Sequence, residues 1–312
     1  NLTIARNGKN IQGVANDSLI STNRASLILV FVDDTRGWVY TVESNVSFYG
    51  PTFIAATGGT VTESGDYKIH SFTGDGCFVV SDAGTPAGSD TVDYLVVAGG
   101  GSGGGAAGFS GTGAGAGGAG GFRESSGAAS GCYTASPLGS GVSALPVSAT
   151  TYPITVGGGG SVGPNCSQGN NGSNSVFSTI TSTAGGGGGG YIPGSSPSLN
   201  GRPGGSGGGM TCTGSIGSGN TPPVSPSQGN PGGNYTHGSG GGGATVAGGA
   251  APKIGGAGAT SSINGTPTGR AGGGGGGGGG VNPGNPTPLG TNGGSASAGG
   301  GAGGSSGVGG TP

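Results

Sequence analysis

The chain has few of the side chains on which catalytic and metal sites depend. Only 20 of its 312 residues are charged, nine basic and eleven acidic, and it has two histidines, one methionine and one tryptophan. No continuous run of 18 apolar residues is present, so we expect no membrane-spanning segment and no membrane insertion. The basic residues form no patch, so we expect no nucleic-acid partner.

Cysteine is also sparse. The four cysteines, Cys77, Cys132, Cys166 and Cys212, lie far apart and form no CxxC pair. With only two histidines in the chain, this spacing argues against a zinc site, and we expect neither a metal nor another cofactor. Free thiols are the simpler interpretation, whereas a disulfide would imply an oxidising final environment.

Glycine is abundant, with 88 residues, and its distribution divides the sequence at residue 97. The first 97 residues hold 15 of the charged residues and 11 glycines, with a net charge of −5. The remaining 215 residues hold 77 glycines and five charged residues, with a net charge of +3. We therefore predict a β-structured end at 1–45, a small antiparallel β-module at 46–97 and a glycine-rich domain at 98–312. Because the chain begins at Asn1 without a methionine or a secretory signal, we interpret it as a fragment or processed product of something longer.

Strand patterns account for the first 97 residues. The apolar run 25–32 and the run 38–42 flank Asp33 and Asp34, so we predict a hairpin in which these aspartates form the turn rather than a catalytic carboxylate pair. We interpret 43–60 as a connector. Three more strands are expected, at 66–73, 77–81 and 91–97, with Gly74 to Gly76 as the tight turn between the first two.

Three interpretations compete for the glycine-rich domain. Disorder would follow from the 88 glycines and 19 prolines of the chain. Collagen would need a strict Gly-X-Y period and more proline, which the sequence lacks. The third is a bundle of polyglycine II helices, which have three residues per turn and whose backbone groups must be bonded by neighbouring helices.

The length and purity of the glycine runs favour the bundle. Runs of six to eleven residues would span roughly 20–35 Å at about 3.1 Å per residue, compatible with one compact slab. Since only glycine lets backbones approach from all sides, we predict that 272–280 is an interior helix and that the mixed run 238–249 is an edge helix. The predicted fold class is thus mostly β plus irregular, with N-terminal β-modules, a sandwich of polyglycine II helices and essentially no α-helix.

Ordered blocks of the sequence resemble parts of bacteriophage tail fibres. Blocks similar to the carboxyl-terminal parts of tail fibres lie at 2–8, 23–33 and 36–38. Blocks similar to glycine-rich fibre-tip proteins lie at 65–72, 93–101, 152–157, 172–181 and 228–233. Together the two sets of blocks extend over most of the chain.

The resemblance implies a receptor-binding adhesin with a polyglycine II domain, located in the virion at the tip of a tail fibre. It implies that loops at one end of the sandwich bind a bacterial surface receptor, either an outer-membrane protein or a glycan. Its other implied partners are tail-fibre chains in a homotrimer, although a monomeric tip on a trimeric shaft is equally compatible. The alternative is a structural or antifreeze-like extracellular protein that uses a flat helix face.

We do not expect an enzyme. Glycan cleavage needs two positioned carboxyl groups, and the glycine-rich domain has one, Glu124. No G-x-S-x-G elbow supports a nucleophilic serine. The function class that remains is binding, through loops held on a rigid scaffold. The aromatic and basic loop residues selected as receptor contacts are Arg123, Tyr133, Tyr191, Arg202, Tyr235 and His237.

One disulfide is considered among the loops. If successive helices run antiparallel, loops alternate between the two ends of the slab, and loops 164–183 and 210–237 share an end. Cys166 and Cys212 are then the pair that could be joined.

Overall fold

The computed structural model describes residues 2–21, 25–43, 52–85, 88–106, 113–128, 133–164, 166–191, 199–250, 253–278 and 298–301. Within these ranges it contains strands, irregular backbone and the short 3-10 turn η1 (Pro137–Gly139), with no α-helix, which confirms the predicted fold class. No helix in these ranges is therefore long and apolar enough to cross a membrane. The chain divides into two compact units: Asn1–Ala56, Val80–Thr91 and Pro146–Thr150 form unit 1, and Thr57–Val79, Val92–Leu145 and Thr151–Pro312 form unit 2. The predicted boundaries at 45 and 97 stay predictions.

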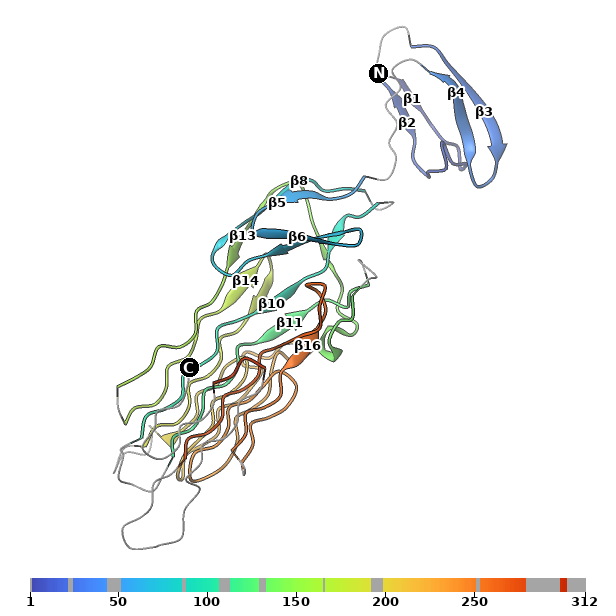
Figure 1. Ribbon diagram of the computed structural model, residues 1–312. Coiled ribbons are helices and arrows are strands. Elements are labelled where there is room, and N and C mark those ends of the chain that lie inside the picture. The colour runs from blue at the N-terminus through green and yellow to red at the C-terminus, as the bar shows by residue number, and fades with distance from the viewer. Residues whose placement is uncertain are drawn as a thin grey trace, which may run out of the picture. The chain divides into compact units, whose positions relative to one another are not determined.

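Unit 1 begins with two antiparallel strand pairs (Figure 1). β1 (Leu2–Ile4) pairs with β2 (Ser18–Ile20), and β3 (Leu27–Asp33) pairs with β4 (Gly37–Glu43). The predicted hairpin is therefore confirmed. The carboxylate of Asp33 accepts hydrogen bonds from the N–H groups of Thr35 at 2.8 Å and Arg36 at 2.6 Å, so it forms an Asx turn as expected.

These strand pairs have a small core. Ile11, Ile20 and Tyr40 are its buried hydrophobic side chains in the described part of 2–43. Alternate residues of β3 remain exposed, with Val30 at 45% and Val32 at 54%. Since side chains at i and i+2 share one face of a strand, this face of β3 is apolar and uncovered.

The strands between 55 and 82 pair differently from the prediction. β5 (Ala55–Thr57) and β6 (Thr60–Ser64) lie in or begin in the expected connector. β6 pairs with β7 (Tyr67–Ser71) around Gly65, whose φ of +58° suits the first central position of a tight hairpin turn. The predicted pairing of 66–73 with 77–81 across Gly74 to Gly76 is wrong, because the two-residue turn at Gly65 gives β7 an earlier partner.

The strand that follows joins a larger sheet. β8 (Gly76–Asp82) pairs antiparallel with β13 (Thr151–Thr155). The five-stranded sheet has the order β15-β14-β13-β8-β5, with β14 at Ser175–Phe177 and β15 at Ile180–Ser182. The predicted strand 91–97 is split into β9 (Thr91–Val92), which pairs with β12 (Leu145–Pro146), and β10 (Leu95–Val97), which pairs with β11 (Phe122–Glu124).

From Ala98 onward, each glycine-rich segment bonds to a given neighbour at every third residue. The N–H groups of 98, 101 and 104 donate to the carbonyls of 121, 118 and 115. The N–H groups of 99, 102 and 105 donate to the carbonyls of 173, 170 and 167, while 99, 102 and 105 accept from 185, 188 and 191. This three-residue period, with bonds to neighbouring segments, is the pattern of polyglycine II. We call these packed segments the glycine lattice, and in Figure 1 they run alongside one another.

The interior of the glycine lattice is not pure glycine. Its continuously buried segments are 115–122, 184–190, 204–211 and 238–244. They include Ala116, Ala119 and the fully buried Ser206 and Ser239. The prediction of one edge helix at 238–249 is wrong, because 238–244 is interior and the chain turns at Thr245, where the N–H of Gly243 donates to Val246. The run 272–280 is described to residue 278 and alternates buried with half-buried residues.

The two ends of the glycine lattice differ. At the end that we call the strand end, β10 and β11 lie near β16 (Ala259–Ser261), which pairs with β17 (Thr268–Arg270). Phe122, Ala244 and Ala259 form a buried cluster there. The opposite end, which we call the loop end, is marked by the described turns near 164–167, 211–214 and 234–238.

Candidate binding site at the loop end

Three of the six predicted contact residues lie at the loop end. The N–H of Tyr191 donates to the carbonyl of Gly105 at 2.8 Å, where the segment 184–191 ends. Tyr235 and His237 lie in a single turn, with ring centroids 5.4 Å apart and planes tilted by 49°. Thr236 Oγ1 lies 2.9 Å from His237 Nδ1. All three predicted residues are half-buried.

Lattice hydrogen bonds fix the turn that carries Tyr235 and His237. Before the turn, Met210 N–H donates to Gly233 at 3.4 Å; after it, Ser239 N–H donates to Met210 at 3.1 Å. At the turn itself, Cys212 N–H donates to Thr236 at 2.7 Å. The two rings are therefore held on a short loop that is tied to the glycine lattice at its base and at its apex.

Sequence reasoning missed Lys253. This residue is only 5% exposed, and its Nζ donates to the carbonyl of Gly277 at 3.2 Å. The same Nζ lies 5.7 Å from the ring centroid of Tyr235, within the range of a cation–π interaction. Burial lowers the pKa of Lys253. A signal was present in the sequence, because Lys253 is the one lysine after residue 97.

Arg202 lies apart from this group, within the glycine lattice. Its N–H donates to Gly187 and its carbonyl accepts from Gly208, so its backbone belongs to the lattice bonding. The side chain is half-buried, and its Nε is buried with no hydrogen-bond partner in the described part of the chain. The structure does not bring it together with Tyr235 and His237.

Arg123 and Tyr133 lie at the strand end. Arg123 is in β11, and its guanidinium donates to the carbonyl of Thr181 at 3.5 Å. The hydroxyl of Tyr133 donates to the carbonyl of Ser125 at 3.3 Å. Burial raises the pKa of Tyr133 to about 12, against a smaller opposing effect of the hydrogen bond with Ser125. Both side chains make contacts within the chain, at the end opposite to Tyr235.

The acid at the strand end is enclosed. Glu124 is 2% exposed, and one of its carboxylate oxygens accepts from the N–H of Ser136 at 2.8 Å. The nearby Ser125 hydroxyl donates to Asp93 at 2.7 Å. These bonds tie β11 to the segments around it.

The cysteines and the acidic residues supply no metal centre in the described ranges. Cys166 and Cys212, considered above as a pair, are both free thiols, so the disulfide is not formed. Cys77 is also free, and Cys132 lies outside the described residues. Within those ranges, no three His, Cys, Asp or Glu side chains gather as metal ligands.

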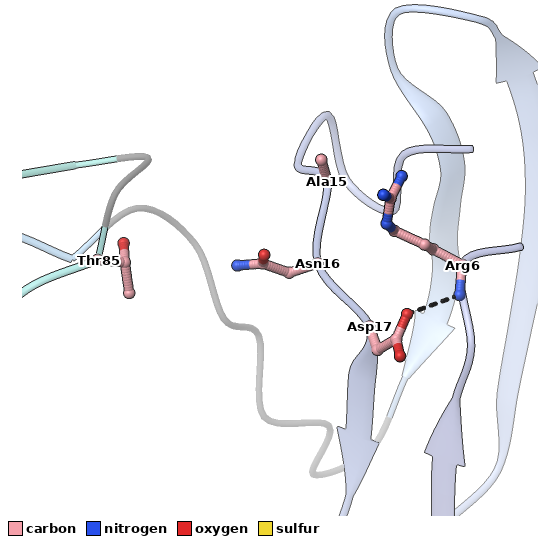
Figure 2. A pocket seen from close by; sticks show the side chains of 5 residues that line it. All are labelled: Arg6, Ala15, Asn16, Asp17 and Thr85. Carbon is pink, nitrogen blue, oxygen red and sulfur yellow. Dashed lines mark hydrogen bonds between the residues drawn. The ribbon is translucent and has the colours of Figure 1, made fainter. Parts of the chain in front are cut away.

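An open hollow in unit 1 offers little for chemistry. Figure 2 shows its lining residues, Arg6, Ala15, Asn16, Asp17 and Thr85. The carboxylate of Asp17 accepts a hydrogen bond from the backbone N–H of Arg6 at 2.9 Å. With one carboxylate and no histidine or cysteine, this lining does not form a nucleophile–base pair.

Comparison with known proteins identifies the glycine-rich part. No curated protein and no solved structure matches the chain. The model of a family described as a glycine-rich domain matches residues 79–312. Because this match covers more than half of the chain, the chain belongs to the glycine-rich domain family.

Proposed function

We propose that the chain is the distal tip of a bacteriophage tail fibre, an adhesin that binds a receptor on the bacterial surface. The observation that carries the proposal is the tethered turn at the loop end, which displays Tyr235 and His237 on a backbone-bonded lattice. Recognition commonly resides in loops on rigid scaffolds, and tyrosine offers contact area at low entropic cost. The resemblance of the ordered sequence blocks to phage fibres supplies the biological setting.

The proposal includes other tail-fibre chains as partners, in a homotrimer. The exposed apolar side chains of β3 support it, because an uncovered face with Val30 and Val32 is suited to burial against another chain. A two-stranded hairpin with a small core also gains stability from such burial. The proposal places the protein in the virion and assigns it no catalytic role.

The test is competition for adsorption. Purified full-length chain should block adsorption of the phage that carries it, and Tyr235→Ala should lose at least about tenfold in competing power, as truncation of an aromatic anchor does. Val246→Ala is the control, since Val246 is 52% exposed in the turn that follows Ala244, and Ala244 belongs to the buried cluster at the strand end. Hydrogen exchange would verify that both variants keep the glycine lattice.

A different outcome would favour the alternative function. If the wild-type chain left adsorption unchanged and bound to ice or to a structural partner instead, the adhesin proposal would be overturned. Equal losses in Tyr235→Ala and Val246→Ala would contradict the assignment of recognition to the loop end.

A further inference from the structure

Asparagine–glycine pairs are positions at which a protein chain can modify itself without an enzyme. The backbone nitrogen of a glycine is not shielded by a side chain, so it can attack the side-chain amide carbon of a preceding asparagine. The chain contains five such pairs, which begin at Asn7, Asn171, Asn200, Asn264 and Asn292, and the last lies outside the described residues. Because the two reacting residues are the same in every pair, the fold is what can make the pairs differ.

Hydrogen bonds restrain three of the four described pairs. The glycine N–H groups of these three are bonded within the fold: Gly172 donates to Gly185 at 3.1 Å, Gly201 to Ser215 at 2.9 Å and Gly265 to Ser262 at 2.8 Å. The side-chain oxygen of Asn171 also accepts from the N–H of Gly187 at 2.9 Å, and that of Asn200 accepts from the N–H of Ser215 at 2.7 Å. Attack requires the asparagine to rotate about its Cα–C bond, which would break these bonds.

The pair Asn7–Gly8 is different. Within the described residues, neither the side chain of Asn7 nor the N–H of Gly8 makes a hydrogen bond. Asn7, with a φ of +45°, and Gly8, with a φ of +79°, are the central residues of a turn of type I′, which the N–H of Lys9 closes by donating to Arg6 at 3.0 Å. Both central residues are exposed, and a Cβ on Gly8 would meet nothing within 4 Å. Rotation of Asn7 therefore needs only one exposed backbone bond to open.

We propose that Asn7 is a site of spontaneous deamidation. The nitrogen of Gly8 attacks Cγ of Asn7, and a C–N bond forms between them. The bond from Cγ to Nδ2 breaks, and Nδ2 leaves as ammonia with the proton that the Gly8 nitrogen gives up. Water then adds to one of the two carbonyl carbons of the resulting five-membered succinimide ring, so the product is aspartate or isoaspartate.

The modified turn would change the segment that follows it. The carbonyl of Asn10 accepts from the N–H of Trp38 at 2.9 Å, and its side-chain nitrogen donates to the carbonyl of Thr35 at 2.8 Å. The turn at 6–9 fixes where Asn10 meets these groups. Isoaspartate lengthens the main chain of the turn by one carbon, so we expect deamidation to loosen 2–43 and to leave the glycine lattice unchanged.

The experiment follows ageing of the full-length chain in mildly alkaline buffer. Peptide mapping by mass spectrometry measures deamidation at each site, and enzymatic methylation detects isoaspartate. In the folded chain we expect Asn7 to react at least about tenfold faster than Asn171 and Asn200, because those two must first break bonds of the lattice. Asn264, whose glycine is bonded within an exposed turn, should be intermediate. In urea the differences should largely disappear, because the fold no longer restrains any of the pairs.

Asn7→Gly is the matched control variant. Glycine suits a φ of +45°, a Gly–Gly pair is compatible with the same turn, and the variant has no side-chain amide to lose at this position. After ageing, the amides of 2–43 should exchange faster in the wild type than in Asn7→Gly, while those of the glycine lattice should exchange alike. If Asn7→Gly failed to fold, fresh and aged wild-type chains would give the same comparison.

Two results would overturn the proposal. One is a folded chain in which Asn171 or Asn200 reacts as fast as Asn7, and the other is an Asn7 that reacts in urea but not in the folded chain. Deamidation at Asn7 with unchanged exchange in 2–43 would contradict the expected effect on the hairpins. All of these measurements are independent of receptor binding, so they leave the proposed adhesin function to its own test.

Discussion

The β1–β4 hairpins of unit 1 and the glycine lattice of unit 2 are stabilised in opposite ways. The hairpins bury a few large side chains, among them Ile20 and Tyr40, and leave the rest of their apolar residues exposed. The glycine lattice buries its large side chains, such as Phe122 and Met210, near its two ends, and between them it bonds its backbone in several directions. In one region the side chains determine stability; in the other the absence of side chains does.

The close approach of backbones explains why the second strategy needs glycine. A Cβ on Gly188 would lie 2.0 Å from the carbonyl oxygen of Gly115, and one on Gly117 would lie 2.0 Å from that of Gly101. Backbone atoms held by hydrogen bonds on several sides have little room to move away. The hydrogen bonds between these backbones must offset the large entropic cost of ordering glycine. A substitution that forces the backbones apart should therefore cause a large loss of stability.

The largest effect is therefore expected from a single methyl group inside the glycine lattice. Gly188→Ala should destabilise unit 2 by at least about 3 kcal/mol, because the added Cβ overlaps with the backbone of Gly115. The measurement is hydrogen exchange of the amides between 98 and 278, which should lose protection in the variant.

Gly158→Ala is the matched control for this prediction. Gly158 belongs to the same lattice, yet a Cβ there would meet nothing within 4 Å. We expect a change below about 0.5 kcal/mol, as for other surface substitutions. Similar loss of protection in both variants would mean that close backbone approach is not what holds the lattice.

The next effect is expected in the hairpins. Ile20→Ala removes most of one of the few buried side chains and should cost about 3 kcal/mol, enough to unfold a module with so small a core. Leu2→Ala, at a residue that is 62% exposed, is the control and should be nearly neutral. In Ile20→Ala, the amides of 2–43 should lose protection from hydrogen exchange, while the amides of the glycine lattice should keep it. Loss of protection in both regions would contradict separate modes of stabilisation.

The contrast between the regions also separates what the sequence could predict from what it could not. Run lengths and purity predicted polyglycine II, since few other structures use uninterrupted glycine. The strand pairing around Gly65 was missed, because two glycine turns lay within ten residues and only the tertiary pairing of β8 with β13 decides between them. The interior position of 238–244 was missed because Ala244 fits into a cluster with Phe122 that lies far away in sequence.

The candidate site shows the same limit. Tyr235 and His237 meet because they belong to one short turn, and that proximity follows from the sequence. The opposite placement of Tyr133 depends on the segment after β11, which contains η1 and leads into β12 and β13 rather than a simple return loop. Lys253 joins Tyr235 only through bonding between distant segments, which composition does not encode.

A smaller effect is expected where a side chain completes the glycine lattice. Gln228 is fully buried at the strand end, and its amide oxygen accepts from the N–H of Thr183 at 2.8 Å while its amide nitrogen donates to Pro222 at 3.1 Å. Gln228→Ala leaves these groups without partners and should cost about 2 kcal/mol in urea unfolding. Gln168→Ala, which removes one partly buried bond to Asn200, should cost less than about 1 kcal/mol. If Gln228→Ala lowered the free energy of unfolding by no more than Gln168→Ala, the side-chain bonds at the strand end would be dispensable.

The smallest effect concerns pH, and it tests whether the strand end behaves as a side-chain core. Burial raises the pKa of Tyr133 to about 12, whereas tyrosine in the unfolded chain titrates near its ordinary value of about 10. The stabilisation is complete below pH 10 and is lost as the pH rises to about 12, because the unfolded state releases the proton first. Tyr133→Phe should therefore show a shallower fall of the urea midpoint between pH 10 and 12 than the wild type.

Tyr94, whose pKa is also raised mainly by burial, is present in both proteins, so the difference between them isolates Tyr133. Identical slopes would mean that Tyr133 is solvated, and the strand end would then resemble the loop end more closely than its buried contacts indicate.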